Sequence, residues 1–448
     1  MMEQEKNIKW RQKFHLEPPD GWMNDPNGLS YFGGEYHVYF QYSPKDPNGK
    51  TPRGWGHYHG KDLFHMSYDR EVLTPGIPED RNGVYSGSGV ENDGKLHLFY
   101  TGNVKLIGDY NYITNGREAN VIYVNTEDGS NMSEKQVLLR NEDYPDFCSC
   151  HVRDPKVWKD GDVWKMVLGA RNKQDEGCVL LYQSKNLTNW EYETCISKKE
   201  FGFMWECPDY FQIDGKGFLS VSPQGLPHYE TKWQNLYQSG YFPVIGALEE
   251  NRLGEFTEWD MGFDFYAPQT FEDAKGRRIL FAWFGMDYQA YGNATIDLGW
   301  QHCLTLPREL TVDENGVLHQ YPISELEQLR KEVTHYKEGE EKETPVPFDL
   351  EAKVEKSFQI SIDHSLYICY DKEKKLMTME FTNQDYGCGR TIRKAKLEDC
   401  TKLRMVADRS SIEVYFNDGS MVASTRFYPK EERVRLRLEG IEADVWEF

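Results

Sequence analysis

Hydrophobic and polar residues alternate along most of the chain in short runs that are separated by tight turns. Five segments share one arrangement: an apolar or aromatic run, a turn that contains Gly, and a second run in which apolar and polar residues alternate. Asp-Gly and similar pairs between two runs of period two are a strong signal of a β-hairpin. We therefore expect hairpins at 29–40, 90–100, 157–167, 210–221 and 270–283.

The five hairpins recur at a regular interval. Starting from Gly34, the steps between their turn glycines are 60, 67, 54 and 61 residues. Each step has room for a sheet of about four strands with its loops, and sheets repeated in this way are typical of a β-propeller. The pattern predicts a five-bladed β-propeller, which we assign to residues 1–320.

The pattern changes after this region. Residues 323–332 have helical spacing, and the charged, Pro-containing stretch 336–347 is typical of a linker. We therefore expect a linker with a short helix at 321–345 and a β-sandwich at 346–448. The fold class is all-β. The sandwich strands are expected at 357–362, 366–370, 376–381, 402–406, 412–416 and 434–438.

The composition is that of a globular protein, with 39% hydrophobic and 28% charged residues among 448. Lys and Arg number 52 against 73 Asp and Glu, and the net charge of −21 argues against nucleic acid or an anionic membrane as partner. No apolar stretch is long enough to span a membrane, and the first residues lack the apolar core of a signal peptide. Nine mostly scattered Cys favour a reduced protein, so we expect a cytoplasmic location. Whether the sandwich mediates a homodimer is left open.

A cluster of polar or small residues precedes each predicted hairpin by a similar distance. Equivalent positions in successive propeller blades lie around one end of the central channel, so the acids Asp25, Asp154 and Glu206 are expected to face a common space. The clusters are 22–28, 85–89, 153–155, 205–208 and 265–268.

Three acids in one funnel favour catalysis. A nucleophilic carboxylate must be ionised, whereas a carboxyl group that donates a proton needs a raised pKa. Asp25 stands beside the amide donor Asn24, which suits an ionised carboxylate. Glu206 stands beside the weakly polar Cys207, which suits a carboxyl group with a raised pKa. The chemistry indicated is glycoside hydrolysis by one nucleophile and one proton donor.

The same residues carry a resemblance to glycoside hydrolase family 32, in the same order along the chain and essentially from end to end. The motifs are Trp22 to Gly28, Arg153-Asp154-Pro155, Glu206-Cys207, Phe265-Tyr266-Ala267, Leu306 to Leu310 and Asp408 to Phe416. The resemblance implies a five-bladed propeller followed by a sandwich, and a retaining mechanism on β-fructofuranosides.

Carried over position by position, the resemblance implies that Asp25 is the nucleophile and Glu206 the general acid/base, while Asp154 stabilises the transition state. It implies no metal or organic cofactor. Cys148, Cys150 and His151 lack a second ligand pair at zinc spacing, so we predict no metal there. The residues expected to bind the sugar are Trp22, Asn24, Gln41, Trp55, Tyr85, Ser86, Arg153, Tyr266 and Trp283.

Within the family, the segments 222–225, 234–241 and 299–305 are most similar to bacterial intracellular sucrose-6-phosphate hydrolases. This similarity favours sucrose or sucrose 6-phosphate as substrate, with short fructans of the inulin or levan type as the alternative. Gly49 stands near the place where many relatives have Trp, which leaves the leaving-group preference open. A propeller that only binds sugar is a further alternative, but it would need neither Asp25 nor Glu206.

Overall fold

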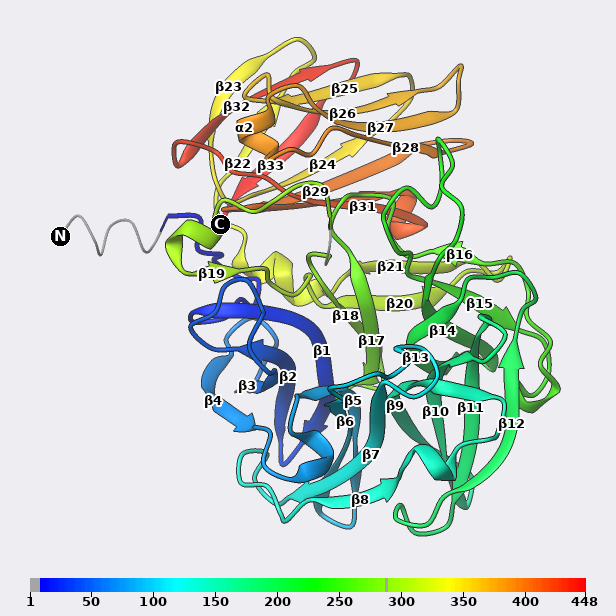
Figure 1. Ribbon diagram of the computed structural model, residues 1–448. Coiled ribbons are helices and arrows are strands. Elements are labelled where there is room, and N and C mark those ends of the chain that lie inside the picture. Colours follow the sequence, from blue (N-terminus) through cyan, green and yellow to red (C-terminus); the bar gives the residue numbers. More distant parts are fainter. Residues whose placement is uncertain (1–8, 287–288) are drawn as a thin grey trace.

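The computed structural model describes residues 9–286 and 289–448, and β-strands dominate these residues. The strands form two bodies, a ring of five sheets and a two-sheet sandwich that stands against it (Figure 1). This arrangement confirms the predicted five-bladed propeller followed by a sandwich. In the described part of the chain, no helix has the length and apolar character needed to cross a bilayer.

Each propeller blade consists of strands that follow one another in the sequence, from the centre of the ring to its rim. In blade order the strands are β1 (Gly21–Phe32), β2 (Glu35–Ser43), β3 (Gly54–Gly60) and β4 (Ser67–Leu73); β5 (Val84–Asn92), β6 (Lys95–Lys105), β7 (Arg117–Thr126) and β8 (Gln136–Leu139); β9 (Cys148–Asp160), β10 (Val163–Asn172), β11 (Gly177–Ser184) and β12 (Glu191–Ser197); β13 (Met204–Ile213), β14 (Lys216–Gln224), β15 (Gly240–Val244) and β16 (Thr257–Glu258); β17 (Tyr266–Glu272), β18 (Arg278–Trp283), β20 (Arg308–Val312) and β21 (Leu318–Pro322).

The five predicted hairpins are confirmed, and each one joins the first two strands of a blade. In the second blade the turn residues Asp93 and Gly94 have φ values of 51° and 74°. Such left-handed turns match the twist of the paired strands, which explains the Asp-Gly signal in the sequence.

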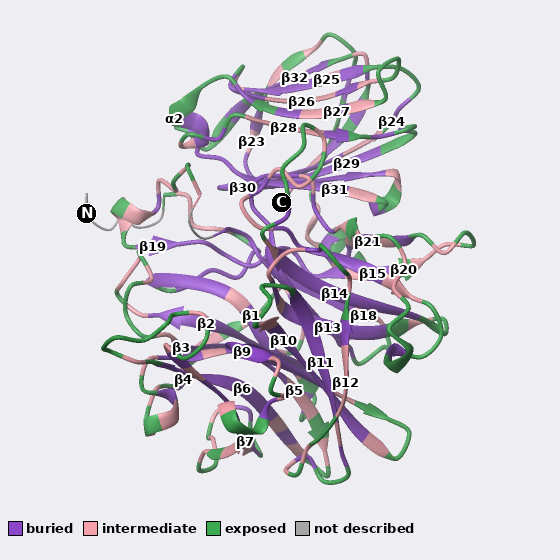
Figure 2. Ribbon diagram, turned by 45° about the vertical axis from the view of Figure 1, so that its right-hand side comes forward, coloured by how far each residue is buried: buried purple, intermediate pink, exposed green. Residues whose placement is uncertain are grey.

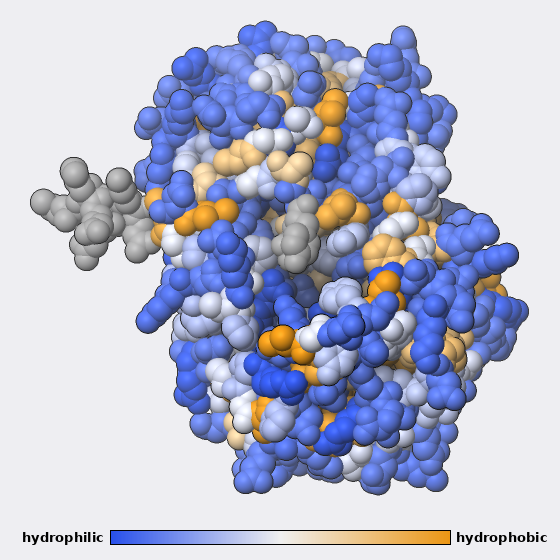
Figure 3. Space-filling model, in the orientation of Figure 1, coloured by the Kyte–Doolittle hydropathy of each residue, from blue (hydrophilic) through white to orange (hydrophobic). Residues whose placement is uncertain are grey.

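The inner strands β1, β5, β9, β13 and β17 contact one another in a closed ring. The short strand β19 (Trp300–Gln301) pairs with β1 in parallel, so a segment that follows β18 of the last blade fastens the first blade. Apolar side chains fill the spaces between neighbouring blades, and the inner strands are largely buried (Figure 2). On the face shown in Figure 3, hydrophobic residues reach the surface only in small, separate areas.

The sandwich contains the six predicted strands, and its two sheets enclose one apolar core. Each sheet has six strands. In sheet order the first contains β22 (Val333–Tyr336), β33 (Ala443–Glu447), β24 (Phe348–Lys353), β29 (Lys402–Asp408), β30 (Ser411–Phe416) and β31 (Met421–Arg426), and the second contains β23 (Glu341–Pro345), β32 (Arg433–Glu439), β25 (Phe358–Ile362), β26 (Leu366–Asp371), β27 (Leu376–Phe381) and β28 (Ile392–Lys396).

One expectation about this region is wrong. Strands β22 and β23 lie within 321–345, which was expected to be a linker, and each forms the edge of one sandwich sheet. The predicted helix is a short 3-10 helix, η5 (Ser324–Leu329). The other helices of the described residues are shorter still: α2 (Gln384–Gly387), η1 (Pro78–Asp80), η2 (Asn141–Asp143), η3 (Leu248–Glu250), η4 (Ile296–Leu298) and η6 (Asn417–Gly419).

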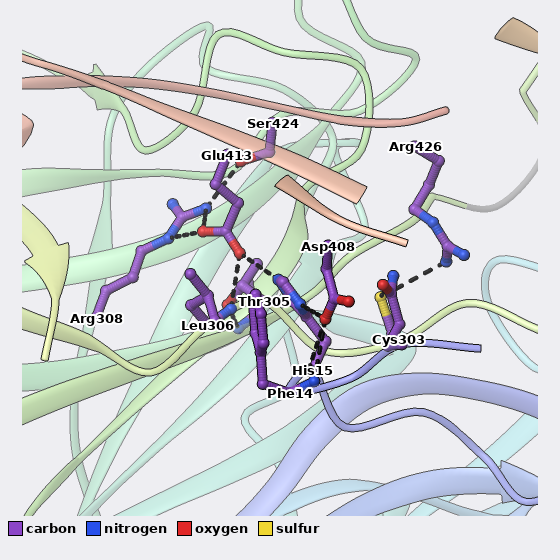
Figure 4. A network of polar contacts seen from close by, with 12 residues as sticks. Phe14, His15, Cys303, Thr305, Leu306, Arg308, Asp408, Glu413, Ser424 and Arg426 are labelled. Atoms are coloured by element: carbon purple, nitrogen blue, oxygen red, sulfur yellow. Dashed lines mark hydrogen bonds and ion pairs between the residues drawn. The ribbon is translucent and has the colours of Figure 1, made fainter. Parts of the chain in front are cut away.

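A buried polar network joins the two bodies (Figure 4). His15, which precedes β1, contacts Asp408 Oδ2 through Nδ1 at 2.8 Å and Glu413 Oε1 through Nε2 at 2.9 Å. Arg308 of β20 pairs with the second oxygen of Glu413 at 2.7 Å. Because these side chains are almost wholly buried, removal of one partner leaves a charge without compensation.

Replacement of His15 by Gln is expected to lower the free energy of unfolding by about 3 kcal/mol near pH 6. Burial alone would lower the pKa of His15, but Asp408 and Glu413 outweigh it and raise the pKa above its usual 6.5. The charged imidazole therefore contributes fully below about pH 6.5, and the contribution is lost as the pH rises through the folded-state pKa. Urea unfolding of both proteins at about pH 6 and pH 9 should show a larger difference at pH 6.

The matched control is His335→Gln, because His335 forms a surface pair with Asp444 and half of its side chain is exposed. Exposed pairs contribute about 0–1 kcal/mol, so this variant should unfold almost like the wild type. Equal destabilisation by His15→Gln at both pH values would contradict a charged His15 in the network.

Candidate active site

The inner strand of every blade carries a β-bulge with one extra residue, and the five bulges occupy equivalent positions. They lie between Met23 and Pro26, Val84 and Gly87, Arg153 and Lys156, Glu206 and Asp209, and Tyr266 and Gln269. A bulge bends its strand and redirects the side chains on either side. The polar clusters identified in the sequence are thus the segments at which the inner strands bend.

The backbone at these bulges departs from ordinary strand geometry. Four of the five bulges contain or end at a proline: Pro26, Pro155, Pro208 and Pro268. The interrupted hydrogen-bond ladder tolerates a residue without an N–H at these positions. Asp154, Cys207 and Ala267 have φ values of 65°, 47° and 49°, in the left-handed region that is unfavourable for side chains other than Gly. Strain of this kind at equivalent positions of three blades indicates a functional site.

The carboxylates of Asp25, Asp154 and Glu206 line one cavity of about 340 Å³, as expected. The volume is within the range of small-molecule sites. Cys207 lies between two of the acids, because its Sγ is 3.6 Å from Asp25 Oδ2 and 3.6 Å from Asp154 Oδ2. Acids from blades that are distant in the sequence therefore converge on a single space.

A chain of side-chain hydrogen bonds orients Asp25. The Trp22 indole N–H donates to Asn24 Oδ1 at 2.8 Å, and Asn24 Nδ2 donates to Gln41 Oε1 at 2.5 Å. Gln41 Nε2 donates to Ser86 Oγ at 2.8 Å, and the Ser86 hydroxyl donates to Asp25 Oδ2. Asn24 Nδ2 also reaches Asp25 Oδ1 at 3.1 Å. Both oxygens of Asp25 are thereby held by neutral donors.

Glu206 is held by stronger partners. Arg153 donates to Glu206 Oε1 from Nε at 3.1 Å and from Nη2 at 2.7 Å. Gln224 Nε2 and the Tyr266 hydroxyl each donate to Glu206 Oε2 at 2.6 Å. Four hydrogen bonds thus favour the ionised form of this carboxylate.

These surroundings overturn the expected order of pKa values. Burial raises the pKa of Asp25, and hydrogen bonds from Ser86 and Asn24 offset only part of this rise. Burial would also raise the pKa of Glu206, but the charge of Arg153 and the hydrogen bonds from Tyr266, Arg153 and Gln224 hold it below its usual range. The expectation of a raised pKa at Glu206 is therefore wrong for this structure, because the ion pair with Arg153 outweighs burial.

The third acid, Asp154, also has a raised pKa. Burial, together with the charges of Glu206 and Asp25, raises the pKa of Asp154 to about 7 against the opposing charge of Arg153. The backbone N–H of Cys207 donates to Asp154 Oδ2 at 2.9 Å and fixes the carboxylate in place. Asp154 is thus poised to change its protonation near neutral pH.

The structure brings together all but two of the residues expected in the site. Trp22 lies behind the pocket, where it holds Asn24. Trp55 is wholly buried on β3, away from the pocket, and its indole N–H donates to the backbone oxygen of Tyr85 at 3.1 Å. The expectation that Trp55 binds sugar is wrong, because the third strand of a blade lies outside the inner ring. The residues that do line the cavity are Asn24, Asp25, Gln41, Tyr85, Ser86, Arg153, Asp154, Glu206, Tyr266 and Trp283.

Several pocket residues were not predicted from the sequence. Gln224 falls in a segment that the sequence singled out only for its resemblance, so its contact with Glu206 could have been suspected. His151 also lines the pocket, although the sequence draws attention to it only as a possible metal ligand. The described residues contain no cluster suited to a metal ion. The remaining polar or aromatic additions have no shared motif and are Arg53, Tyr112, Arg117, Arg171, Phe203 and Tyr237.

Comparison with known proteins gives matches over nearly the whole chain. The family model "Glycosyl hydrolases family 32 N-terminal domain" matches residues 15–322, and "Glycosyl hydrolases family 32 C terminal" matches residues 323–445. The chain is 39% identical over 440 residues to the sucrose-6-phosphate hydrolase of Bacillus subtilis, with 94% of this chain and 89% of that protein covered.

Solved structures agree with the sequence matches. The sucrose-6-phosphate hydrolase of Lactobacillus gasseri has a TM-score of 0.89 at 25% identity, with 99% of this chain and 95% of that chain covered. A mutant of the Bombyx mori beta-fructofuranosidase, solved in complex with sucrose, has a TM-score of 0.85 at 27% identity, with coverages of 99% and 96%.

Proposed function

The chain belongs to glycoside hydrolase family 32, and on that premise we propose that it hydrolyses the β-fructofuranosyl bond of sucrose or sucrose 6-phosphate. The observation that carries the proposal is that two carboxylates with unlike partners, Asp25 and Glu206, line one cavity of about 340 Å³. The similarity to a beta-fructofuranosidase in complex with sucrose supports the substrate class.

In the first step of the proposed mechanism, a carboxylate oxygen of Asp25 attacks C2 of the fructosyl unit. Glu206 reacts in its protonated form, which is the minor form in the free site, and gives this proton to the glycosidic oxygen. The bond to the leaving sugar then breaks and a fructosyl ester of Asp25 forms. In the second step Glu206 takes a proton from water, and the water oxygen attacks C2. Asp25 then leaves as a carboxylate, and the configuration at C2 is retained.

Asp154 has a supporting role in this proposal. Its carboxylate lies next to Asp25 across Cys207 and is held by a backbone N–H, so it can bind fructosyl hydroxyl groups without moving. When positive charge develops on the sugar ring, a fixed carboxylate nearby lowers the energy of the transition state. Arg153 completes the site by holding Glu206 in place.

The direct test of this function is incubation of the purified protein with sucrose, sucrose 6-phosphate and a short inulin-type oligosaccharide. Hydrolysis of either sucrose compound supports the proposal, and better use of the oligosaccharide favours the alternative fructan hydrolase. If the protein hydrolyses none of the three sugars, the proposed function is contradicted. We also propose the cytoplasm as the location, a reducing compartment in which nine unpaired cysteines are expected.

Replacement of Tyr266 by Phe is expected to shift the alkaline limb of the kcat/KM profile to higher pH by about one unit. The Tyr266 hydroxyl donates to the ionised form of Glu206 and so lowers its pKa. Without this bond the pKa of Glu206 rises, and the protonated form that starts the reaction persists to higher pH. The measurement is kcat/KM for sucrose as a function of pH.

Tyr210→Phe is the control for this shift, because the Tyr210 hydroxyl accepts a hydrogen bond from Gln212 and lies outside the pocket. Its pH profile should match that of the wild type. An alkaline limb that stays in place or moves to lower pH in Tyr266→Phe would show that Glu206 is not the group that must be protonated.

A further inference from the structure

The pocket is rich in arginine although the chain as a whole is acidic. The net charge is −21, yet the cavity is lined by Arg53, Arg117, Arg153 and Arg171. Two of these arginines serve the acids, because Arg153 pairs with Glu206 and the charge of Arg53 lowers the pKa of Asp25. Arg117 and Arg171 have no such role in the proposed mechanism.

Arg117 is buried without an acidic partner. Only 8% of the residue is exposed, its Nε is buried with no hydrogen-bond partner, and the described residues contain no carboxylate in an ion pair with it. Its guanidinium lies 5.8 Å from the ring centres of Tyr85 and Tyr112. By contrast, the fully buried Arg308 and Arg390 each pair with a carboxylate at 2.7 Å. A buried cation without a counter-charge is costly, and an anionic ligand would remove that cost.

Arg171 lies in the same part of the pocket. Its guanidinium is 4.6 Å from the ring centre of Phe203, and its ion pair with Asp175 at 2.9 Å involves a largely exposed acid. His151 reports the combined charge, because burial and the charges of Arg153, Arg117 and Arg171 lower its pKa to about 3. This side of the pocket therefore has a positive potential, and His151 is uncharged at neutral pH.

The position of His151 connects this positive region to the proton donor. His151 Nδ1 lies 3.3 Å from Arg153 Nη1, and Arg153 in turn binds Glu206. The general acid of a glycosidase faces the leaving group, since it protonates the glycosidic oxygen. The positive region therefore lies on the side where the leaving sugar binds rather than on the side of Asp25.

We propose that Arg117, together with Arg171, binds a phosphate group on the leaving sugar and so makes the enzyme prefer sucrose 6-phosphate to sucrose. The inference rests on the proposed function, which assigns the leaving-group side to Glu206. Planar guanidinium groups bind phosphate oxygens through paired, charge-assisted hydrogen bonds. The rings of Tyr85 and Tyr112 hold Arg117 from the sides, while the described residues leave its charge without an acid.

The test compares kcat/KM for sucrose 6-phosphate and sucrose in the wild type and in Arg117→Met, Arg117→Lys and Arg171→Met. The wild type should prefer the phosphorylated sugar, and Arg117→Met should lower that preference by about 10- to 100-fold, the loss typical of one charged hydrogen-bonding partner. Arg117→Lys keeps the charge and should lose less. Arg140→Met is the matched control, because Arg140 pairs with Glu79 in the same blade outside the pocket.

Product inhibition gives a readout that does not depend on turnover of the phosphorylated substrate. Glucose 6-phosphate should inhibit sucrose hydrolysis more strongly than glucose or inorganic phosphate does, and Arg117→Met should remove most of the difference. Thermal unfolding of each variant identifies any that fails to fold, and Arg171→Met then provides the second test.

The outcomes separate the two proposals. A wild type that hydrolyses sucrose but has no preference for the phosphorylated sugar overturns the phosphate site and leaves the proposed function intact. A preference that survives in both Arg117→Met and Arg171→Met overturns the assignment of these residues. A wild type that hydrolyses neither sugar contradicts the proposed function itself.

Discussion

Replacement of Asp25 by Asn is expected to lower kcat for sucrose hydrolysis by about 10⁴-fold or more, as the loss of a catalytic nucleophile does in other hydrolases. The amide cannot form the fructosyl ester, so the double displacement is blocked at its first step. Asn differs little in size from Asp, and the neighbours Asn24 and Ser86 can still contact the side chain. Steady-state kinetics of the purified variant on sucrose provides the measurement.

Asp20→Asn is the matched control for this variant. Asp20 lies just before β1 and outside the pocket, where it accepts hydrogen bonds from the Tyr42 hydroxyl and the backbone of Lys45. Its kcat should stay close to that of the wild type. Near-normal turnover in Asp25→Asn would rule out Asp25 as nucleophile, and a wild type that binds sucrose without hydrolysis would favour the sugar-binding propeller.

Replacement of Glu206 by Gln is expected to lower sucrose hydrolysis by about 10²- to 10⁴-fold, the usual contribution of general acid–base catalysis. The loss should be much smaller for a β-fructoside with an aryl leaving group, because such a group departs without protonation. Azide should accelerate turnover of the aryl substrate, since it can attack the fructosyl ester without a general base. The measurement is the rate on both substrates with and without azide.

The product configuration completes this test, because azide should yield the fructosyl azide with the configuration of the substrate retained. Asp25→Asn serves as the comparison, since a better leaving group cannot replace a missing nucleophile. Equal losses on sucrose and on the aryl substrate would contradict the role of Glu206 as proton donor.

The arrangement of the acids was predictable because it follows from repetition. Each hairpin begins a blade, and the position of a residue relative to its hairpin determines its place around the ring. Asp25, Asp154 and Glu206 could therefore be brought together from the sequence alone. The bulges at these positions could not be predicted, because a bulge is a property of how two strands pair.

Features that depend on contacts between blades were missed or mistaken. The pKa order of Asp25 and Glu206 depends on Arg153, whose side chain reaches across to another blade. Arg117 and Arg171 come from different strands and share no spacing that a sequence pattern could reveal.

Two further expectations proved wrong. Strand β23, with Glu341, Lys342 and Glu343, is rich in charged residues and therefore resembles a linker, although charge is also a usual property of edge strands that protects a sheet from further pairing; β22 is a strand of only four residues that precedes it. Trp55 is expected in the pocket only through the resemblance to the family. Its strand in fact pairs with the strand of Gln41, and its ring packs between blades.

The most direct test of the account is to trap the fructosyl ester on the nucleophile. Glu206→Gln is mixed with an aryl β-fructofuranoside, quenched with acid during turnover, digested and analysed by mass spectrometry. Without its general base, this variant should accumulate the intermediate. The account predicts that the peptide containing Asp25 carries the added mass of one fructosyl unit. The same mass on another carboxylate, or active turnover with no modified peptide and an inverted product, would contradict the account.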